Sequence, residues 1–338
     1  MKKSIFIILM LFFGTVFSIS ANAKEDISIV CTNSAIADFA SNLITKNVTI
    51  EYVIDSGACP AYYTLKPSQV ELITNADVII SLGNQNMEFW LADLLSYNDH
   101  YSLIECKDMG EWNIPTGAIS YVEHISNGLK NIFPELNESI ENKTNVYINN
   151  ITKKADELKD IIISSNYTDK KVIAMGWQKD FLEYFGLNVV YTYGPPQGLS
   201  AKDQLDIINA AMDSDISVII DNLQSGTDFG ARVASETGKI HVIFSNFPEA
   251  IPGTDTYLEM IDYNIDQLTK GIDTYQKMIG YNINQKIEDN ETFSSSFTEI
   301  SGLKKQVTDL ELERNLFATI SVIFLVLAIL FYIIYKKK

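Results

Sequence analysis

The sequence predicts an α/β protein of two lobes, each with a mainly parallel sheet flanked by helices, bridged by one long helix and followed by a C-terminal transmembrane helix. Three observations carry this prediction. Short runs rich in Val and Ile alternate with amphipathic stretches in two separate parts of the chain, a stretch without strand signals lies between them, and residues 316–335 carry no charge. Strand–helix alternation at this spacing is typical of parallel sheets covered by helices on both faces.

The N-terminal lobe is expected over residues 24–115. Four runs have the composition of buried strands, and they cover residues 27–31, 48–54, 76–83 and 101–106. Amphipathic stretches between these runs predict the helices. One helix is expected to begin at Pro67, because proline is favoured at the first position of a helix.

Residues 116–168 are expected to form the helical link between the lobes. From Tyr121 to Ser164 the strand signals stop, and apolar residues such as Ile140, Ile151 and Leu158 recur at helical spacing. This period predicts one long helix.

The C-terminal lobe is expected over residues 169–280, with strands at 171–175, 187–193, 216–221 and 239–244. Ser200 and Asp203 have the spacing of a capped helix start. Apolar periodicity predicts a closing helix over residues 257–279.

Both ends of the chain are predicted to be targeting or membrane segments. Residues 1–23 have the basic start, apolar run and small-residue cleavage site of a secretory signal. Residues 316–335 are long enough to cross a hydrocarbon core of roughly 30 Å as a helix. The lysines at 336–338 favour the cytoplasmic side. The predicted location is the cell membrane, as a single-pass protein with an extracellular body and a cytoplasmic C-terminus.

Residues 281–315 are expected to form a polar linker and a juxtamembrane helix. Ile300, Leu303, Val307 and Leu310 repeat at a spacing of three to four residues. This short pattern predicts either an ordinary amphipathic helix or a short coiled coil.

The charge balance excludes some classes of partner. The chain has 43 Asp and Glu against 26 Lys and Arg, a formal net charge of −17. Nucleic-acid binding needs basic surface, so we expect no nucleic-acid partner. Six Asn-x-Ser/Thr sequons, at Asn47, Asn137, Asn142, Asn150, Asn166 and Asn290, predict a surface glycoprotein if the body is exported.

The candidate site lies where the strands of the two lobes end. In open parallel sheets, ligands bind beyond the carboxyl ends of the strands. The side chains expected there are mostly polar and uncharged, which suits recognition of a small molecule or a metal complex rather than proton transfer. The predicted ligand-binding residues are Cys59, Tyr62, Tyr63, Trp177, Gln178, Asn222, Gln224 and Asn246. No nucleophile–histidine pair or catalytic motif appears, and we expect no enzyme.

Sulfur ligands suggest a second kind of site. Cys31, Cys59 and Met175 each lie at or beyond the end of a predicted strand, and Asp221 ends another. Thiolate and thioether ligands favour a soft ion such as Cu(I), so these four residues are the predicted metal ligands. A Cys31–Cys59 disulfide, or inert buried thiols with Met175 as packing, would explain the same residues. With Cys106 the cysteine count is three, so at least one thiol is unpaired within the chain.

The segments "KPSQVELITNADVIISLG", "LSAKDQLDIINAA" and "IIDNLQSGTDFGARVASETG", with the long link between them, resemble the zinc/manganese family of ABC-transporter solute-binding proteins over residues 26–280. The resemblance implies two α/β lobes with a metal between them, and partnership with an ABC permease and its ATPase. Asp221 matches a carboxylate of that family.

The ligand histidines of that family are missing from this chain. The expected positions read Cys59 to Thr64, Gly110 to Trp112, and Met175, and Asn246 stands where the family has a final aspartate. His100, His124 and His241 lie elsewhere, and His241 is expected to be a satisfied sheet residue.

The resulting hypothesis is a membrane-tethered, extracytoplasmic solute-binding protein of an ABC importer that captures a metal ion or metal complex in the cleft between the lobes. The resemblance implies zinc or manganese, and the sulfur residues suggest copper. The alternative is a surface interaction protein derived from such a receptor, with no transported metal.

Overall fold

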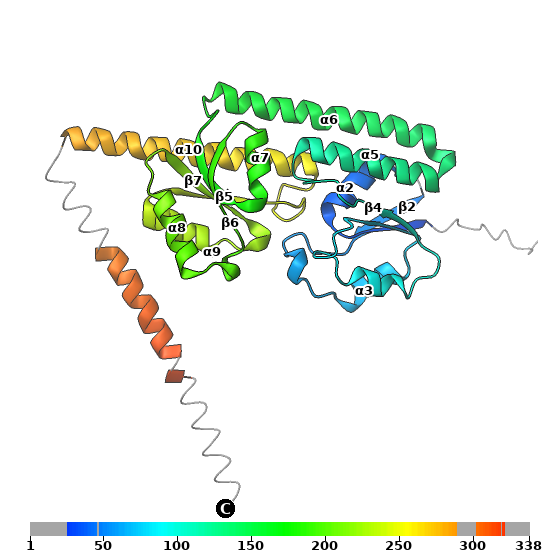
Figure 1. Ribbon diagram of the computed structural model, residues 1–338, viewed down its shortest axis with the longest axis horizontal. Helices are drawn as coiled ribbons and strands as arrows, with labels where there is room; N and C mark the ends of the chain where they lie inside the picture. The colour runs from blue at the N-terminus through cyan, green and yellow to red at the C-terminus, as the bar shows by residue number, and fades with distance from the viewer. Residues whose placement is uncertain (1–25, 46, 289–301, 319, 322–338) are drawn as a thin grey trace, which may run out of the picture. The chain divides into compact units, whose positions relative to one another are not determined.

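The computed structural model describes residues 26–45, 47–288, 302–318 and 320–321. Residues up to Tyr275 form one compact unit, and those from Gln276 form a second. The first unit contains two four-stranded sheets in which every strand pair is parallel. The predicted two-lobed α/β architecture is therefore confirmed (Figure 1).

The sheet of lobe one has the strand order β2-β1-β3-β4. Its strands are β1 (Ile27–Cys31), β2 (Val48–Tyr52), β3 (Val78–Ser81) and β4 (Ser102–Glu105). Its helices are α2 (Ser34–Leu43), the 3₁₀ turn η1 (Pro60–Tyr62), α3 (Pro67–Thr74) and α4 (Leu91–Leu95). β1 leads directly into α2 because the Asn33 side chain caps the helix, accepting a bond from the Ile36 amide at 3.0 Å.

Lobe two repeats this arrangement with the strand order β6-β5-β7-β8. Its strands are β5 (Lys171–Met175), β6 (Asn188–Tyr193), β7 (Ile216–Asn222) and β8 (Ile240–Phe244). Its helices are η3 (Gly176–Gln178), α7 (Lys179–Tyr184), η4 (Pro196–Gly198), α8 (Ala201–Ala211), η5 (Leu223–Ser225), α9 (Asp228–Thr237) and α10 (Tyr257–Glu288). The predicted cap is present at α8. The side chains of Ser200 and Asp203 each accept a hydrogen bond from the backbone amide of the other residue.

The link between the lobes differs from the single helix that was predicted. It consists of α5 (Pro115–Ile132), the turn η2 (Pro134–Leu136) and α6 (Asn137–Ser164), with α5 and α6 packed side by side (Figure 1). The break falls at Pro134, which has no amide hydrogen to donate and disfavours helical geometry in the residue before it. α6 alone runs along both lobes (Figure 1).

One expectation about the C-terminal region changes. α10 continues to Glu288, so the first part of the predicted polar linker is helical. Residues 302–318 form a helix in the segment where one was expected, and its charged side chains include Lys304, Asp309 and Glu313.

The predicted location in the cell membrane is contradicted. Within the part of the chain that the structure describes, no helix is both long enough and apolar enough to span a bilayer. This finding contradicts the predicted single-pass topology with an extracellular body and a cytoplasmic C-terminus. Of the segment 316–335, only residues 316–318, 320 and 321 are described, and the predicted signal peptide and tail lie outside the described residues.

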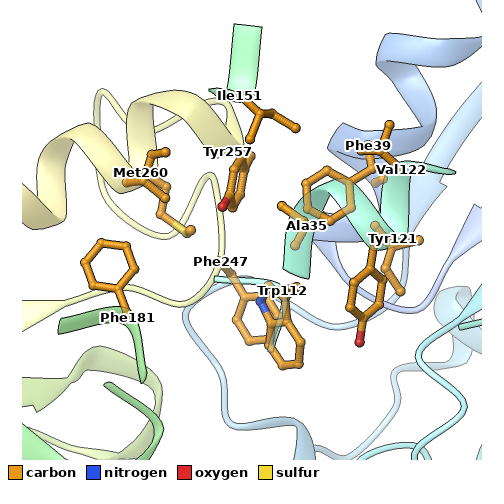
Figure 2. Close-up of a cluster of buried hydrophobic side chains, with 14 of the residues drawn as sticks. Ala35, Phe39, Trp112, Tyr121, Val122, Ile151, Phe181, Phe247, Tyr257 and Met260 are labelled. Carbon is orange, nitrogen blue, oxygen red and sulfur yellow. The ribbon is translucent and has the colours of Figure 1, made fainter. Parts of the chain in front are cut away.

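One hydrophobic core extends through both lobes. Figure 2 shows its centre, where Phe39 and Trp112 of the first half of the chain lie near Phe247, Tyr257 and other apolar side chains of the second half. The rings of Phe39 and Tyr257 meet edge to face with 5.2 Å between centroids. The lobes are therefore packed as one body around a shared interior.

Asp38 is a half-buried carboxylate at this junction. Its Oδ2 accepts bonds from the Tyr147 hydroxyl of α6 at 2.6 Å and from the backbone amide of Tyr257, the first residue of α10, at 3.2 Å. Burial raises the pKa of Asp38 from 3.8 to about 6; these hydrogen bonds oppose the rise, and the charges of Glu249 and Glu259 add to it.

Replacing Asp38 with asparagine should change how stability depends on pH. A carboxyl whose pKa is raised by folding stabilises the fold fully below its unfolded pKa, near 3.8, and that stability is lost as the pH rises through about 6. The variant should therefore be more stable than wild type by about 2–3 kcal/mol at pH 7.5, and by little near pH 4. Urea unfolding at both pH values measures the difference. A difference that stays constant with pH would contradict this prediction.

Candidate functional site

The carboxyl ends of the strands of both lobes meet at one seam, which Gln224 crosses. Its Nε2 donates to the backbone oxygen of Ser56, in the loop after β2, at 2.8 Å and to Ser245 Oγ at 3.0 Å. Its Oε1 accepts from Asn222 Nδ2 at 3.0 Å and from the Asn246 amide at 3.2 Å. The Gln224 side chain, only 8% exposed, therefore uses both of its donors and both of its lone pairs.

Asn246, directly after β8, is held from both lobes. Its Oδ1 accepts from Gln178 Nε2 of lobe two at 2.7 Å, and its backbone oxygen accepts from Trp112 Nε1 of lobe one at 2.8 Å. Figure 2 shows the Trp112 ring stacked on Phe247. The ring centroids are 5.5 Å apart, and the angle between the ring planes is 20°. Polar and aromatic contacts thus join the lobes at the same place.

Four of the predicted ligand-binding residues come together here, and we name Gln178, Asn222, Gln224 and Asn246 the amide cluster. All four are buried, and their side chains are uncharged. The sequence reasoning did not include Ser56, Ser245 or Asn113 among the site residues. The sequence signal for Ser56 and Ser245 was their position after a strand. For Asn113 it was the position next to Trp112, in a stretch that the family resemblance had singled out.

Two buried oxygens beside the amide cluster have no hydrogen-bond partner within the described residues: Gln178 Oε1 and Asn113 Oδ1. Asn113 belongs to lobe one, and its Nδ2 donates to the backbone oxygen of Trp177, next to Gln178, at 3.2 Å. A buried carbonyl oxygen without a donor is costly, so these two atoms mark where a donor would be favoured.

The other predicted ligand-binding residues take different positions. Tyr62 is 75% exposed and Trp177 is 40% exposed, so both can offer an aromatic face to a solute. Tyr63 is buried in lobe one, and its hydroxyl accepts a bond from Gln69 at 2.7 Å. Cys59 lies half-buried in the loop before α3. Tyr63 is thus engaged in packing lobe one.

Two of the three predicted sulfur ligands, Cys31 and Met175, lie in separate interiors. Cys31, Cys59 and Cys106 are all unpaired thiols, so the Cys31–Cys59 disulfide is absent. Cys31 is packed in the core shared by the lobes, and burial followed by the nearby Cys106 raises the pKa of its thiol far above the usual range. Met175 is fully buried in another cluster of lobe two. A thiol held in its protonated form is a poor metal ligand.

Asp221 is already satisfied inside lobe two. It is fully buried, its Oδ1 accepts from the Tyr193 hydroxyl at 2.6 Å, and its Oδ2 lies 2.8 Å from His241 Nε2. Desolvation, followed by the Asp221 charge, raises the pKa of Tyr193 well above its ordinary value. His241 is the satisfied sheet histidine that was predicted, although its partner was not foreseen.

The side chains at and near the seam do not fit a bare zinc or manganese ion as metal ligands. Zinc sites use several histidine, cysteine or carboxylate ligands around one point. Within the described ranges, no three His, Cys, Asp or Glu side chains lie close enough to hold a metal together. The seam offers neutral amides, hydroxyls and backbone oxygens instead.

Comparison with known protein families identifies the family of this chain. The family model described as "ZnuA: Zinc-uptake complex component A periplasmic" matches residues 29–271. The chain belongs to the ZnuA family. The resemblance seen in the sequence is thereby confirmed, and so is the prediction that the chain is not an enzyme, since this is a family of solute-binding receptors.

The relatives of known sequence are distant from this chain. An uncharacterized protein of Rickettsia prowazekii is 28% identical over 190 residues, which are 53% of this chain and 60% of that protein. The manganese-binding lipoprotein MntA of Halalkalibacterium halodurans is 19% identical over 268 residues, 72% of this chain and 87% of the lipoprotein. The chain thus spans less than two thirds of the Rickettsia relative.

Solved structures share the fold. A manganese-bound periplasmic metal binding protein from Candidatus Liberibacter asiaticus aligns with a TM-score of 0.64 and 19% identity, over 74% of this chain and 99% of that chain. A crystal structure of ZnuA aligns with a TM-score of 0.60 and 17% identity, over 71% and 97% of the two chains. At this identity the likeness establishes the architecture only.

Proposed function

We propose that this protein is the solute-binding component of an ABC importer, which presents a metal complex held between its two lobes to a permease and its ATPase. The observation that carries the proposal is the family match over residues 29–271, together with the meeting of strand ends from both lobes at one seam. In open parallel sheets this edge is where ligands bind. Relatives named as manganese- or zinc-binding support a metal-containing solute.

The chemistry of the seam favours a complex over a bare ion. The amide cluster is neutral, and Asp221 is occupied by Tyr193 and His241. Aromatic faces at Tyr62 and Trp177 can stack on an organic ligand of the metal. A solute that keeps its own metal ligands needs only hydrogen bonds and stacking from the protein.

Elemental analysis and native mass spectrometry of the protein, purified without oxygen or chelators, test this proposal. A stoichiometric mass that contains a metal and an organic part would support it. A protein that stays empty after exposure to metal complexes and metal salts would contradict it. That result would favour the alternative, an interaction protein with no transported solute; in the described residues no three His, Cys, Asp or Glu side chains lie together to hold a metal.

A further inference from the structure

The seam between the lobes is closed by the protein's own side chains. The bonds from Gln224 to Ser56 and from Trp112 to Asn246 each connect one lobe to the other, and Asn113 adds a third link through the Trp177 oxygen. Each of these bonds has at least one partner in a loop that directly follows a strand, where a solute of this fold would be held. Protein groups alone make these contacts.

The same bonds make the seam unsuitable for a bare cation. Both hydrogens of the Gln224 amide group are committed to oxygens, and Asn246 Oδ1 and Gln224 Oε1 already accept bonds. A cation would have to displace these donors and would meet only neutral oxygens in return. Divalent transition metals favour imidazole, thiolate or carboxylate ligands over such a set.

We propose that the amide cluster is an internal clamp that holds the lobes together without a metal, and that only a solute carrying its own ligands and its own N–H or O–H groups can displace it. The inference rests on the proposed function and specifies its solute class. Among the described residues, Gln178 Oε1 and Asn113 Oδ1 are buried oxygens that find no donor, and displacing Gln224 would remove the donor of the Ser56 oxygen too. A solute rich in hydrogen-bond donors satisfies all three.

Cys59 provides a natural probe of the clamp. It is half-buried and lies three residues after Ser56, whose oxygen Gln224 holds, whereas Cys31 and Cys106 are fully buried. In the full-length protein, Gln224→Ala should increase the rate at which a thiol reagent labels Cys59 by about five-fold, because, of the four hydrogen bonds that the variant loses, the one to the Ser56 oxygen holds the loop of Cys59. Cys31 and Cys106 should stay unlabelled, which shows that the fold is intact.

The matched control is Gln197→Ala, because Gln197 is exposed in lobe two. This variant should label Cys59 at the wild-type rate. Equal rates in wild type and Gln224→Ala would overturn the clamp. Labelling of all three cysteines in Gln224→Ala would also overturn it, since it would mean that Gln224 acts on the whole fold.

Metal titration tests the solute class. Zn²⁺, Mn²⁺ and EDTA should each leave the Tm of the wild-type protein unchanged within about 1 °C, because a ligand raises stability only in proportion to its occupancy of the folded state. One-to-one uptake of Zn²⁺ or Mn²⁺ with a saturable rise in Tm would overturn the inference and leave the proposed importer role standing. A protein that binds no solute of any kind would overturn the importer role, while the Cys59 rates would still report on the clamp.

Discussion

Replacing Trp112 with alanine is expected to lower the free energy of unfolding by about 3–5 kcal/mol, the usual cost of removing a buried tryptophan. The ring is 7% exposed, stacks on Phe247, and donates its N–H to the Asn246 backbone oxygen. The substitution removes a contact between the lobes and leaves a cavity beside the amide cluster. Urea unfolding followed by circular dichroism measures the loss.

Trp177→Ala is the matched control, because it removes the same side chain from a site where the ring is 40% exposed. Its cost should be about 1 kcal/mol or less, since little apolar surface leaves the interior. Equal losses at the two positions would show that Trp112 contributes no more than a surface ring.

Replacing Asp221 with alanine is expected to cost about 3 kcal/mol or more. His241 Nε2 would lose its partner, and the Tyr193 hydroxyl would keep only the Ile220 backbone oxygen at 3.4 Å, and weakly paired buried polar groups are expensive. Asp213→Ala, which removes an exposed carboxylate paired with Lys171, should cost less than about 1 kcal/mol. Thermal or urea unfolding of both variants tests the contrast.

Gly230 gives this prediction a second, independent check. A Cβ at Gly230 would lie 2.6 Å from Asp221 Cγ, closer than atoms can pack, so Gly230→Ala alone should destabilise the protein. In the Asp221→Ala background the three atoms nearest to the added methyl are removed, and the cost of Gly230→Ala should largely vanish. Additive losses in the double variant would mean that Asp221 does not fill this position.

Most of the fold was predictable because its strands are short, buried and rich in β-branched residues. The run 171–175 matches β5, and the run 27–31 matches β1, residue for residue. The division of the link into α5 and α6 was missed because apolar periodicity continues across Pro134. The extension of α10 to Glu288 was missed because the added stretch is polar, and the sequence carries no signal there for where the helix ends.

The position of the candidate site could be predicted from the strand ends, but only some of its residues could. Strand ends identified Gln178, Gln224 and Asn246, yet the bond from Gln224 to Ser56 joins residues 168 positions apart, which no local pattern reveals. The predicted sulfur ligands show a second limit of sequence-based prediction, which is the direction in which a side chain points. Cys31 and Met175 each sit at the end of a strand, but whether a strand's last side chain points into a core or toward the seam depends on packing.

The interior shared by the two lobes has a consequence for cooperativity. Phe39 and Tyr257 come from opposite ends of the described body and contact each other, so neither lobe can lose its structure without exposing the other's apolar residues. Calorimetry should therefore record a single transition rather than one for each lobe. For the same reason, a fragment that ends at Ser164 would retain lobe one without Phe247 and Tyr257 to cover it, and would tend to aggregate.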